Sequence, residues 1–375
     1  MTQAVIAGYA RSPFHFANKG ALAKTRPDDL AAAVVQGLIK ATGVNAEDVE
    51  DLLLGCAFPE GEQGLNVARL ISFIAGLPQS VGAATINRFC GSSMQAIHSA
   101  AGAIALGAGD VFVCAGIESM SRVPMLGFNP MPNPQLAEQM PAAYISMGVT
   151  AENVAKKYGI TRQLQEEFAV ASHVKAAKAR QDGKLKDEII TVSSVNEDGC
   201  IRPETNMQAL SGLKPAFDQN GVVTAGTSSP LTDGAAACLV VSESYAKKHK
   251  LPILARIKSV AIAGCSPEMM GIGPVVATRK ALERANLSIN DIDIIELNEA
   301  FASQAIACLR DLNIDTSRVN IDGGALALGH PLGATGARIT GKAAALLKRE
   351  GKRYALATQC IGGGQGIATI LEAVS

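Results

Sequence analysis

Short apolar runs alternate with alanine-rich segments of helical character along most of the chain. The alternation occurs twice at one constant, gapless offset, which places residues 44–55 on 287–298 and residues 110–117 on 353–360. Strands that alternate with helices indicate packed α/β units. A repeat of this length predicts two such halves, related by a pseudo-two-fold axis and paired with each other.

The first copy is interrupted before its last strand, whereas the second copy runs directly into its own. The strand expected at 234–243 follows only after residues 121–227, which start as Pro- and Met-rich irregular chain. Helices are expected there at 151–158 and 162–181, and a long excursion of this kind is often functional. The predicted division is a first half of residues 1–120 plus 228–252, an inserted lid or ligand-gripping domain of residues 121–227, and a second half of residues 253–375.

The composition argues against several classes of protein, namely nucleic-acid-binding, membrane-spanning, zinc-binding and disulfide-rich proteins. Lys and Arg together number 34, equal to Asp and Glu, so no net charge recruits nucleic acid or an anionic membrane. No apolar run has the length of a membrane span, and the N-terminus does not resemble a signal peptide, so we expect a cytoplasmic protein. The eight cysteines include no C-x-x-C pair, which argues against a zinc site and against a disulfide framework.

The segment N-R-F-C-G-S-S, residues 87–93, carries Cys90 at the expected start of a helix over 91–106. The positive end of a helix dipole lowers the pKa of a thiol, which favours a nucleophile. The small residues that follow leave space around the sulfur. A free cysteine is also among the most commonly buried residues, so a packed core thiol remains the competing interpretation.

The segment G-H-P-L-G-A-T-G carries His330 in a turn between glycine and proline rather than among apolar neighbours. This context favours a catalytic histidine over a core one. The repeat places Asn87 on His330, so both copies enter a helix at this point. If the halves pair on their axis, Cys90 and His330 approach each other, as a nucleophile and its base must.

Two further segments follow strands of the second copy. In C-I-G-G-G-Q-G, residues 360–366, consecutive glycines let backbone N–H groups converge on an oxyanion, or only form a tight turn. Cys360 at its start could act as an acid or base if its pKa lay near the working pH. In L-N-E-A-F-A, residues 297–302, Asn298 either caps a helix or holds a water or an oxyanion.

With Cys90, N-E-A-F, G-H-P-L-G-A-T-G and C-I-G-G-G-Q-G in this order and spacing, the sequence resembles the thiolases, which are acyl-CoA:acetyl-CoA acyltransferases. The resemblance implies a thiolase-like α/β fold, with two pseudo-two-fold related halves in five layers and an inserted loop domain. It implies an enzyme of the fatty-acid β-oxidation type, which cleaves 3-ketoacyl-CoA with CoA to acetyl-CoA and a shortened acyl-CoA. CoA is then a co-substrate, and no permanently bound cofactor or metal is expected.

The resemblance also implies roles for individual residues. Cys90 would be the acylated nucleophile, His330 its base, and Cys360 the acid and base for the α-carbon of the acetyl group. Asn298 would hold a water that forms one oxyanion hole with His330, and the N–H groups of Cys90 and Gly362 would form the other. CoA would contact the insertion and its surroundings at Arg202, Ser229, Met147, Ala225 and Phe301.

Some features leave the assignment within the family open. Ser146 stands where biosynthetic members often carry His, and the insertion is short. These departures leave the acyl-chain length undecided. The alternative within the family is an acetoacetyl-CoA thiolase. Cys360 in place of a second histidine disfavours a decarboxylating ketoacyl synthase, and the complete set of reactive positions disfavours a non-catalytic acyl-CoA-binding relative. A homodimer or homotetramer is implied, and a β-oxidation hydratase/dehydrogenase subunit is a further expected partner.

Overall fold

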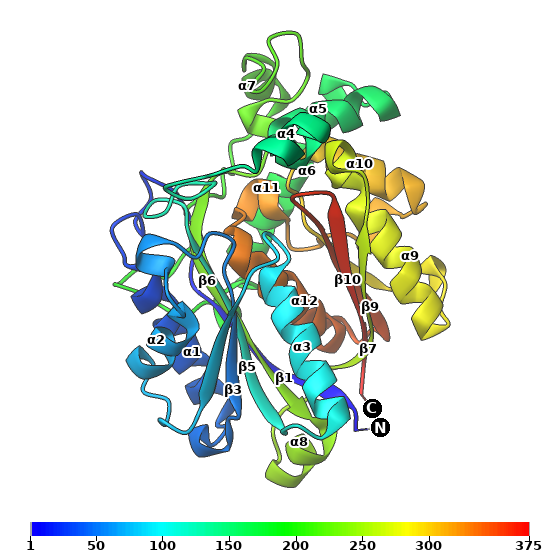
Figure 1. The fold of residues 1–375 in the computed structure, drawn as a ribbon. Coiled ribbons are helices and arrows are strands. Elements are labelled where there is room, and N and C mark those ends of the chain that lie inside the picture. Colours follow the sequence, from blue (N-terminus) through cyan, green and yellow to red (C-terminus); the bar gives the residue numbers. More distant parts are fainter. Residues whose placement is uncertain (1, 375) are drawn as a thin grey trace.

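The strands and helices follow the alternation expected from the sequence. The computed structural model describes residues 2–374, and Figure 1 shows their arrangement. The strands are β1 (Ala4–Arg11), β2 (His15–Phe16), β3 (Asp51–Gly55), β4 (Gly82–Ile86), β5 (Val111–Ser119), β6 (Thr232–Ser242), β7 (Ala255–Gly264), β8 (Ile294–Leu297), β9 (Tyr354–Ile361) and β10 (Gln365–Glu372). The helices are α1 (Pro27–Thr42), α2 (Val67–Ile74), α3 (Ser92–Leu106), α4 (Pro134–Gln139), α5 (Met147–Tyr158), α6 (Arg162–Gln181), α7 (Met207–Ser211), α8 (Glu243–His249), α9 (Gly273–Ala285), α10 (Ala302–Asp311), α11 (Ala325–Leu328) and α12 (Leu332–Glu350).

The strand order shows the duplication directly. Within residues 2–374 the main path of the sheet runs β4-β3-β5-β6-β1-β7-β10-β9-β8. From the central β1–β7 pair outward, β6 and β10 come next, then β5 and β9, then β3 and β8. The pairing is antiparallel near the centre and parallel at β3–β5 and at β8–β9. The two predicted α/β halves therefore have the same topology, and the first carries the additional edge strand β4.

Three apolar clusters separate the layers. The first joins α1 and α2 to the strands of the first half, and the third joins α9 and α10 to those of the second half. Between them, the second cluster contains residues of α3 and α12 together with strands of both halves. The described chain thus has five layers, with α3 and α12 in the middle, as Figure 1 shows and as the sequence predicted.

The halves meet where α3 and α12 pack against each other. A Cβ atom on Gly336 would lie 2.3 Å from the backbone nitrogen of Met94, so the helices approach this closely because residue 336 is glycine. Nearby, the N–H of Ala337 donates to Ser93 Oγ at 2.8 Å. The repeat exchanges these two contacts, because Ser93 corresponds to Gly336 and Met94 to Ala337. The pseudo-two-fold axis therefore passes between the N-terminal parts of the two helices.

Residues 121–227 hold α4 to α7, which gather at one end of the molecule in Figure 1. The helix expected at 162–181 is α6, and its predicted cap is present, because Thr161 Oγ1 accepts from the N–H of Leu164 at 3.3 Å. The other expected helix, α5, begins four residues earlier than predicted, at Met147. Gly148 lowers the helix propensity of that first turn, and its close packing on Phe217 compensates.

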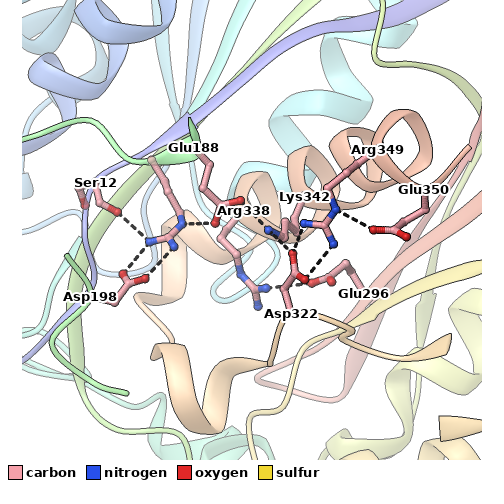
Figure 2. Close-up of polar contacts among 10 residues, drawn as sticks. Ser12, Glu188, Asp198, Glu296, Asp322, Arg338, Lys342, Arg349 and Glu350 are labelled. Carbon is pink, nitrogen blue, oxygen red and sulfur yellow. Dashed lines mark hydrogen bonds and ion pairs between the residues drawn. The ribbon is translucent and has the colours of Figure 1, made fainter. Parts of the chain in front are cut away.

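Buried ion pairs connect the insertion to both halves (Figure 2). Arg11 in β1 pairs with Glu188 at 2.8 Å and with Asp198 at 2.7 Å, and both carboxylates belong to residues 121–227. Glu188 also binds Lys342 of α12 at 2.8 Å, and Lys342 binds Asp322 at 2.7 Å. The insertion is therefore anchored to the central helix that follows His330. No helix among residues 2–374 is long and apolar enough to cross a membrane.

We predict that Asp322→Asn lowers the free energy of unfolding by about 3 kcal/mol, because it leaves the buried Lys342 with Glu188 as its one carboxylate and removes a carboxylate from the partly exposed Arg349. Asp322 is 2% exposed and binds both Lys342 and Arg349. Asp182→Asn is the matched control, since Asp182 also pairs with two lysines but at the surface, where ion pairs contribute less than about 1 kcal/mol. Urea unfolding of both variants measures the difference, and equal losses would contradict the interpretation.

Candidate active site

Cys90 lies in a tight turn between β4 and α3. Phe89 before it has a φ of +43°, in the left-handed region that bulky residues rarely adopt. Ser92 Oγ holds this turn by accepting from the N–H of Arg88 at 2.9 Å and donating to the carbonyl of Phe89 at 2.6 Å. The side-chain amide of Gln359 in β9 donates to the carbonyl of Cys90. Cys90, a half-buried residue, is therefore held two positions before the start of α3.

The sulfur of Cys90 faces two backbone donors. Burial raises the pKa of the thiol to about 11, although hydrogen bonds from the N–H groups of Gly362 and of Cys90 itself act in the opposite direction. The expectation of a lowered thiol pKa is therefore wrong for the ligand-free protein, because loss of solvent outweighs the helix end. Both N–H groups are therefore directed at the sulfur, and backbone donors that converge in this way can form an oxyanion hole.

His330 is 4% exposed and has hydrogen-bond partners on both ring nitrogens. Its Nε2 lies 3.3 Å from Nδ2 of Asn298, and its Nδ1 lies 2.6 Å from Oγ1 of Thr335. The backbone N–H of His330 donates to Thr232 Oγ1 at 3.0 Å, which anchors the loop before α12 to β6. Burial, and then the charge of Arg338, lower the imidazole pKa to about 3. The ring is neutral at neutral pH, as a base must be before it takes a proton.

Cys360 lies near the end of β9, beside Cys90. It is 1% exposed, and its pKa lies well above the usual value because of burial first and the neighbouring Cys90 second. After it, Gly363 and Gly364 have φ values of +79° and +81°, so the glycine run makes the tight turn into β10. The same turn aims the N–H of Gly362 at Cys90. The two interpretations of this segment, a turn and an oxyanion hole, are compatible.

The residues expected to contact CoA fall into two adjoining groups. Arg202 and Ala225 line one small cavity, where the Arg202 guanidinium lies 4.7 Å from the ring centre of Phe16. Met147 and Phe301 pack in one apolar cluster with Cys360. The N–H of Ser229 donates to the carbonyl of Ala300 at 3.0 Å, so Ser229 lies beside the second group. Ser228, which was not predicted, lines the cavity instead.

Besides Ser228, two more polar residues near these segments were not predicted from the sequence. Thr335 lies five positions after His330 in the same motif, so local spacing could have drawn attention to it. Glu118 is 1% exposed, and its carboxylate accepts from the N–H groups of Ala57 and Gly333 at 2.8 and 2.9 Å, although burial raises its pKa. It ties the start of α12 to the first half. Nothing in the local sequence indicates this, because its partners are distant along the chain.

Comparison with known proteins identifies the family. The model of the thiolase N-terminal domain matches residues 4–244, and that of the thiolase C-terminal domain matches residues 251–373. The two matches together cover almost the whole chain. The protein therefore belongs to the thiolase family, as its motifs predicted.

Individual members of the family are similar to this chain over nearly their full length. The chain is 48% identical to a 3-ketoacyl-CoA thiolase of Bacillus subtilis (strain 168) and 46% identical to one of Vibrio vulnificus (strain CMCP6), each match covering 99% of this chain and 100% of the relative. The structure of human mitochondrial 3-ketoacyl-CoA thiolase in complex with CoA has a TM-score of 0.93 and 36% identity, with 100% and 98% of the two chains covered. The Bacillus anthracis acetyl-CoA acetyltransferase has a TM-score of 0.92 and 40% identity, with 100% and 99% covered.

Cys90 in the ligand-free protein should react with iodoacetamide as a thiol of raised pKa. We predict that its alkylation rate rises about tenfold per pH unit from pH 6.5 to 9.5, because the thiolate fraction grows towards the pKa of about 11. Peptide mass spectrometry at short reaction times measures the rate at this residue. A rate that levels off near pH 7 would indicate a resting thiolate–imidazolium pair and contradict the description of the site.

Proposed function

We propose that this chain catalyses the thiolytic cleavage of 3-ketoacyl-CoA by CoA, giving acetyl-CoA and a shortened acyl-CoA, in fatty-acid β-oxidation. The observation that carries the proposal is the convergence on the Cys90 sulfur of the N–H groups of Cys90 and Gly362, with Cys360 beside it. Full-length similarity to proteins named 3-ketoacyl-CoA thiolase supports the same substrate class.

In the first step, Cys90 attacks the C3 carbonyl of the substrate while its proton passes to Nε2 of His330. The tetrahedral oxygen is stabilised by the N–H groups of Cys90 and Gly362. The C2–C3 bond then breaks, which leaves the acyl group as a thioester on Cys90 and the acetyl-CoA part as an enolate. The protonated Nε2 and a water held by Asn298 stabilise the enolate oxygen, and the thiol of Cys360 protonates its α-carbon.

In the second step, the thiol of a new CoA molecule attacks the acyl-Cys90 thioester. The Cys360 thiolate left by the first step takes the proton of that thiol, and the departing Cys90 sulfur recovers its proton from His330. Both cysteines and the neutral histidine are then restored. A thioester exchanges with a thiol at little change in free energy, which makes this second step reversible.

The part of the chain that holds CoA follows from the same proposal. The insertion and the chain that returns from it would bind CoA through Arg202 and Ser229, while Met147, Ala225 and Phe301 would line the tunnel of the pantetheine arm. The proposed division keeps residues 1–120 with 228–252 as one half and residues 253–375 as the other. The apolar cluster that Met147 and Phe301 form with Cys360 supports this path.

We further propose that the protein forms a homodimer or homotetramer. Strand β4 ends the strand order and has β3 as its one strand partner in the described part of the chain. On its outer edge the carbonyl of Ala83 accepts from Asn66, and no strand of residues 2–374 pairs with the rest, so another chain could pair there. Sheet edges of this kind are usually covered in native proteins. An association with a hydratase/dehydrogenase subunit stays a prediction from the resemblance.

An acetoacetyl-CoA thiolase is the second candidate, favoured by the similarity to the Bacillus anthracis acetyl-CoA acetyltransferase. The two candidates share the chemistry of the site and differ in acyl-chain length. We expect kcat/KM for 3-ketoacyl-CoAs of eight or more carbons to equal or exceed that for the four-carbon substrate. A strong preference for four carbons in a thiolysis assay would favour the alternative.

We predict that Cys90→Ala lowers the rate of thiolysis on the order of 10⁴-fold, because the nucleophile is lost. The wild-type protein, mixed with acetyl-CoA and quenched in acid, should gain one acetyl group on the peptide that contains Cys90. Cys114→Ala is the matched control, since this buried thiol lies in the apolar cluster of α3 and the strands, away from the proposed machinery, and its loss should leave the rate near that of the wild type. Unchanged thiolysis in Cys90→Ala would refute the proposed function.

A further inference from the structure

If His330 is the base for Cys90, its imidazole ring must carry its proton on a particular nitrogen. A neutral imidazole carries one proton, on Nδ1 or on Nε2, and only the nitrogen without it can accept a proton from a thiol. For Nε2 to act as the base, the proton must be on Nδ1. The partner of Nδ1 therefore decides whether the resting enzyme is ready to react.

That partner is the hydroxyl of Thr335, which lies on the first turn of α12 and is fully buried. Its Oγ1 lies 2.6 Å from Nδ1 of His330 and 3.0 Å from the carbonyl oxygen of Pro331, four residues earlier. Threonine in a helix commonly donates its one hydroxyl proton to that carbonyl. The oxygen of Thr335 is then left to accept, and it requires the proton of the imidazole on Nδ1.

The hydrogen-bond partner at Nε2 of His330 also favours the tautomer with the proton on Nδ1. Nδ2 of Asn298, a donor, lies 3.3 Å from Nε2 of His330, so Nε2 pairs with it only as an acceptor. A proton on Nε2 would set two donors against each other. Turning the amide over would set Oδ1 against Nε2 and leave the donor Nδ2 without any partner among the described residues, whereas in the present orientation the atom without one is the acceptor Oδ1. Buried donors without a partner are rarer in proteins than under-satisfied carbonyl oxygens, which favours the present orientation.

We propose that Thr335 is a positioning residue for catalysis, which holds His330 in the tautomer with its proton on Nδ1 and thereby leaves Nε2 free to receive the proton of Cys90. This inference rests on the proposed function. A hydroxyl does this without a charge, so it orients the ring and does not raise the imidazole pKa as a carboxylate would. After proton transfer, the hydrogen bond from Nδ1 to Thr335 stays intact, and the new proton on Nε2 is donated to the enolate oxygen of the substrate.

The first test removes the hydroxyl and keeps the shape of the side chain. Thr335→Val should lower kcat for thiolysis about 10- to 100-fold, the size of effect that an orienting partner of a functional histidine typically has, with KM almost unchanged. Thr335→Ser keeps the hydroxyl and should retain a kcat close to that of the wild type. Thr340→Val is the matched control, because Thr340 makes the same bond to Gly336 in α12 but does not contact His330.

The second test reads the tautomer itself. In protein labelled with ¹⁵N-histidine, the resonances of His330 are assigned by their loss in His330→Asn, and their shifts report which nitrogen carries the proton. At pH 7 we expect the proton on Nδ1 in the wild type and a shift towards Nε2 in Thr335→Val.

A wild-type ring protonated on Nε2 would overturn the inference even if Thr335→Val failed to fold, and so would full kcat in a folded Thr335→Val. Neither result would refute the proposed function, because each concerns only the role of Thr335. A wild-type protein without thiolysis would refute that function and leave the tautomer measurement valid.

Discussion

The close contact between α3 and α12 at the pseudo-two-fold axis is the constraint on which the site depends. Gly336 lets α12 approach the backbone of Met94, and Ser93 accepts from Ala337 at the symmetry-related position. Helix α3 begins two residues after Cys90, and α12 begins two residues after His330. The contact fixes the starts of both helices against each other, and Cys90 packs in one apolar cluster with Leu332, two residues after His330.

Burial decides how the groups of this site can react. Loss of solvent raises the pKa of Cys90 to about 11 and lowers that of His330 to about 3, so both are neutral in the ligand-free protein. In the proposed mechanism charge develops during the reaction, and the N–H groups of Gly362 and Cys90 that face the sulfur would stabilise it. The ion pairs of Glu188 with Arg11 and Lys342 hold the insertion on the same framework.

Much of this could be predicted from the sequence, because the repeat carries long-range information that local patterns lack. The register of Asn87 with His330 indicated two equivalent helix starts, and the packing of α3 on α12 agrees. The pKa of Cys90 was expected in the wrong direction, because the local sequence shows the helix end but not the depth of burial. Glu118 was missed because its partners, such as Gly333, come close only after folding.

The central claim is that Cys90 carries the acyl group while the backbone donors of Cys90 and Gly362 bind its oxygen. A crystal structure of the wild-type protein, frozen after brief exposure to acetyl-CoA, tests this most directly. The account predicts an acetyl thioester on Cys90, with its carbonyl oxygen accepting from both N–H groups. An acetyl group on Cys360, or a thioester oxygen directed away from Gly362, would contradict it.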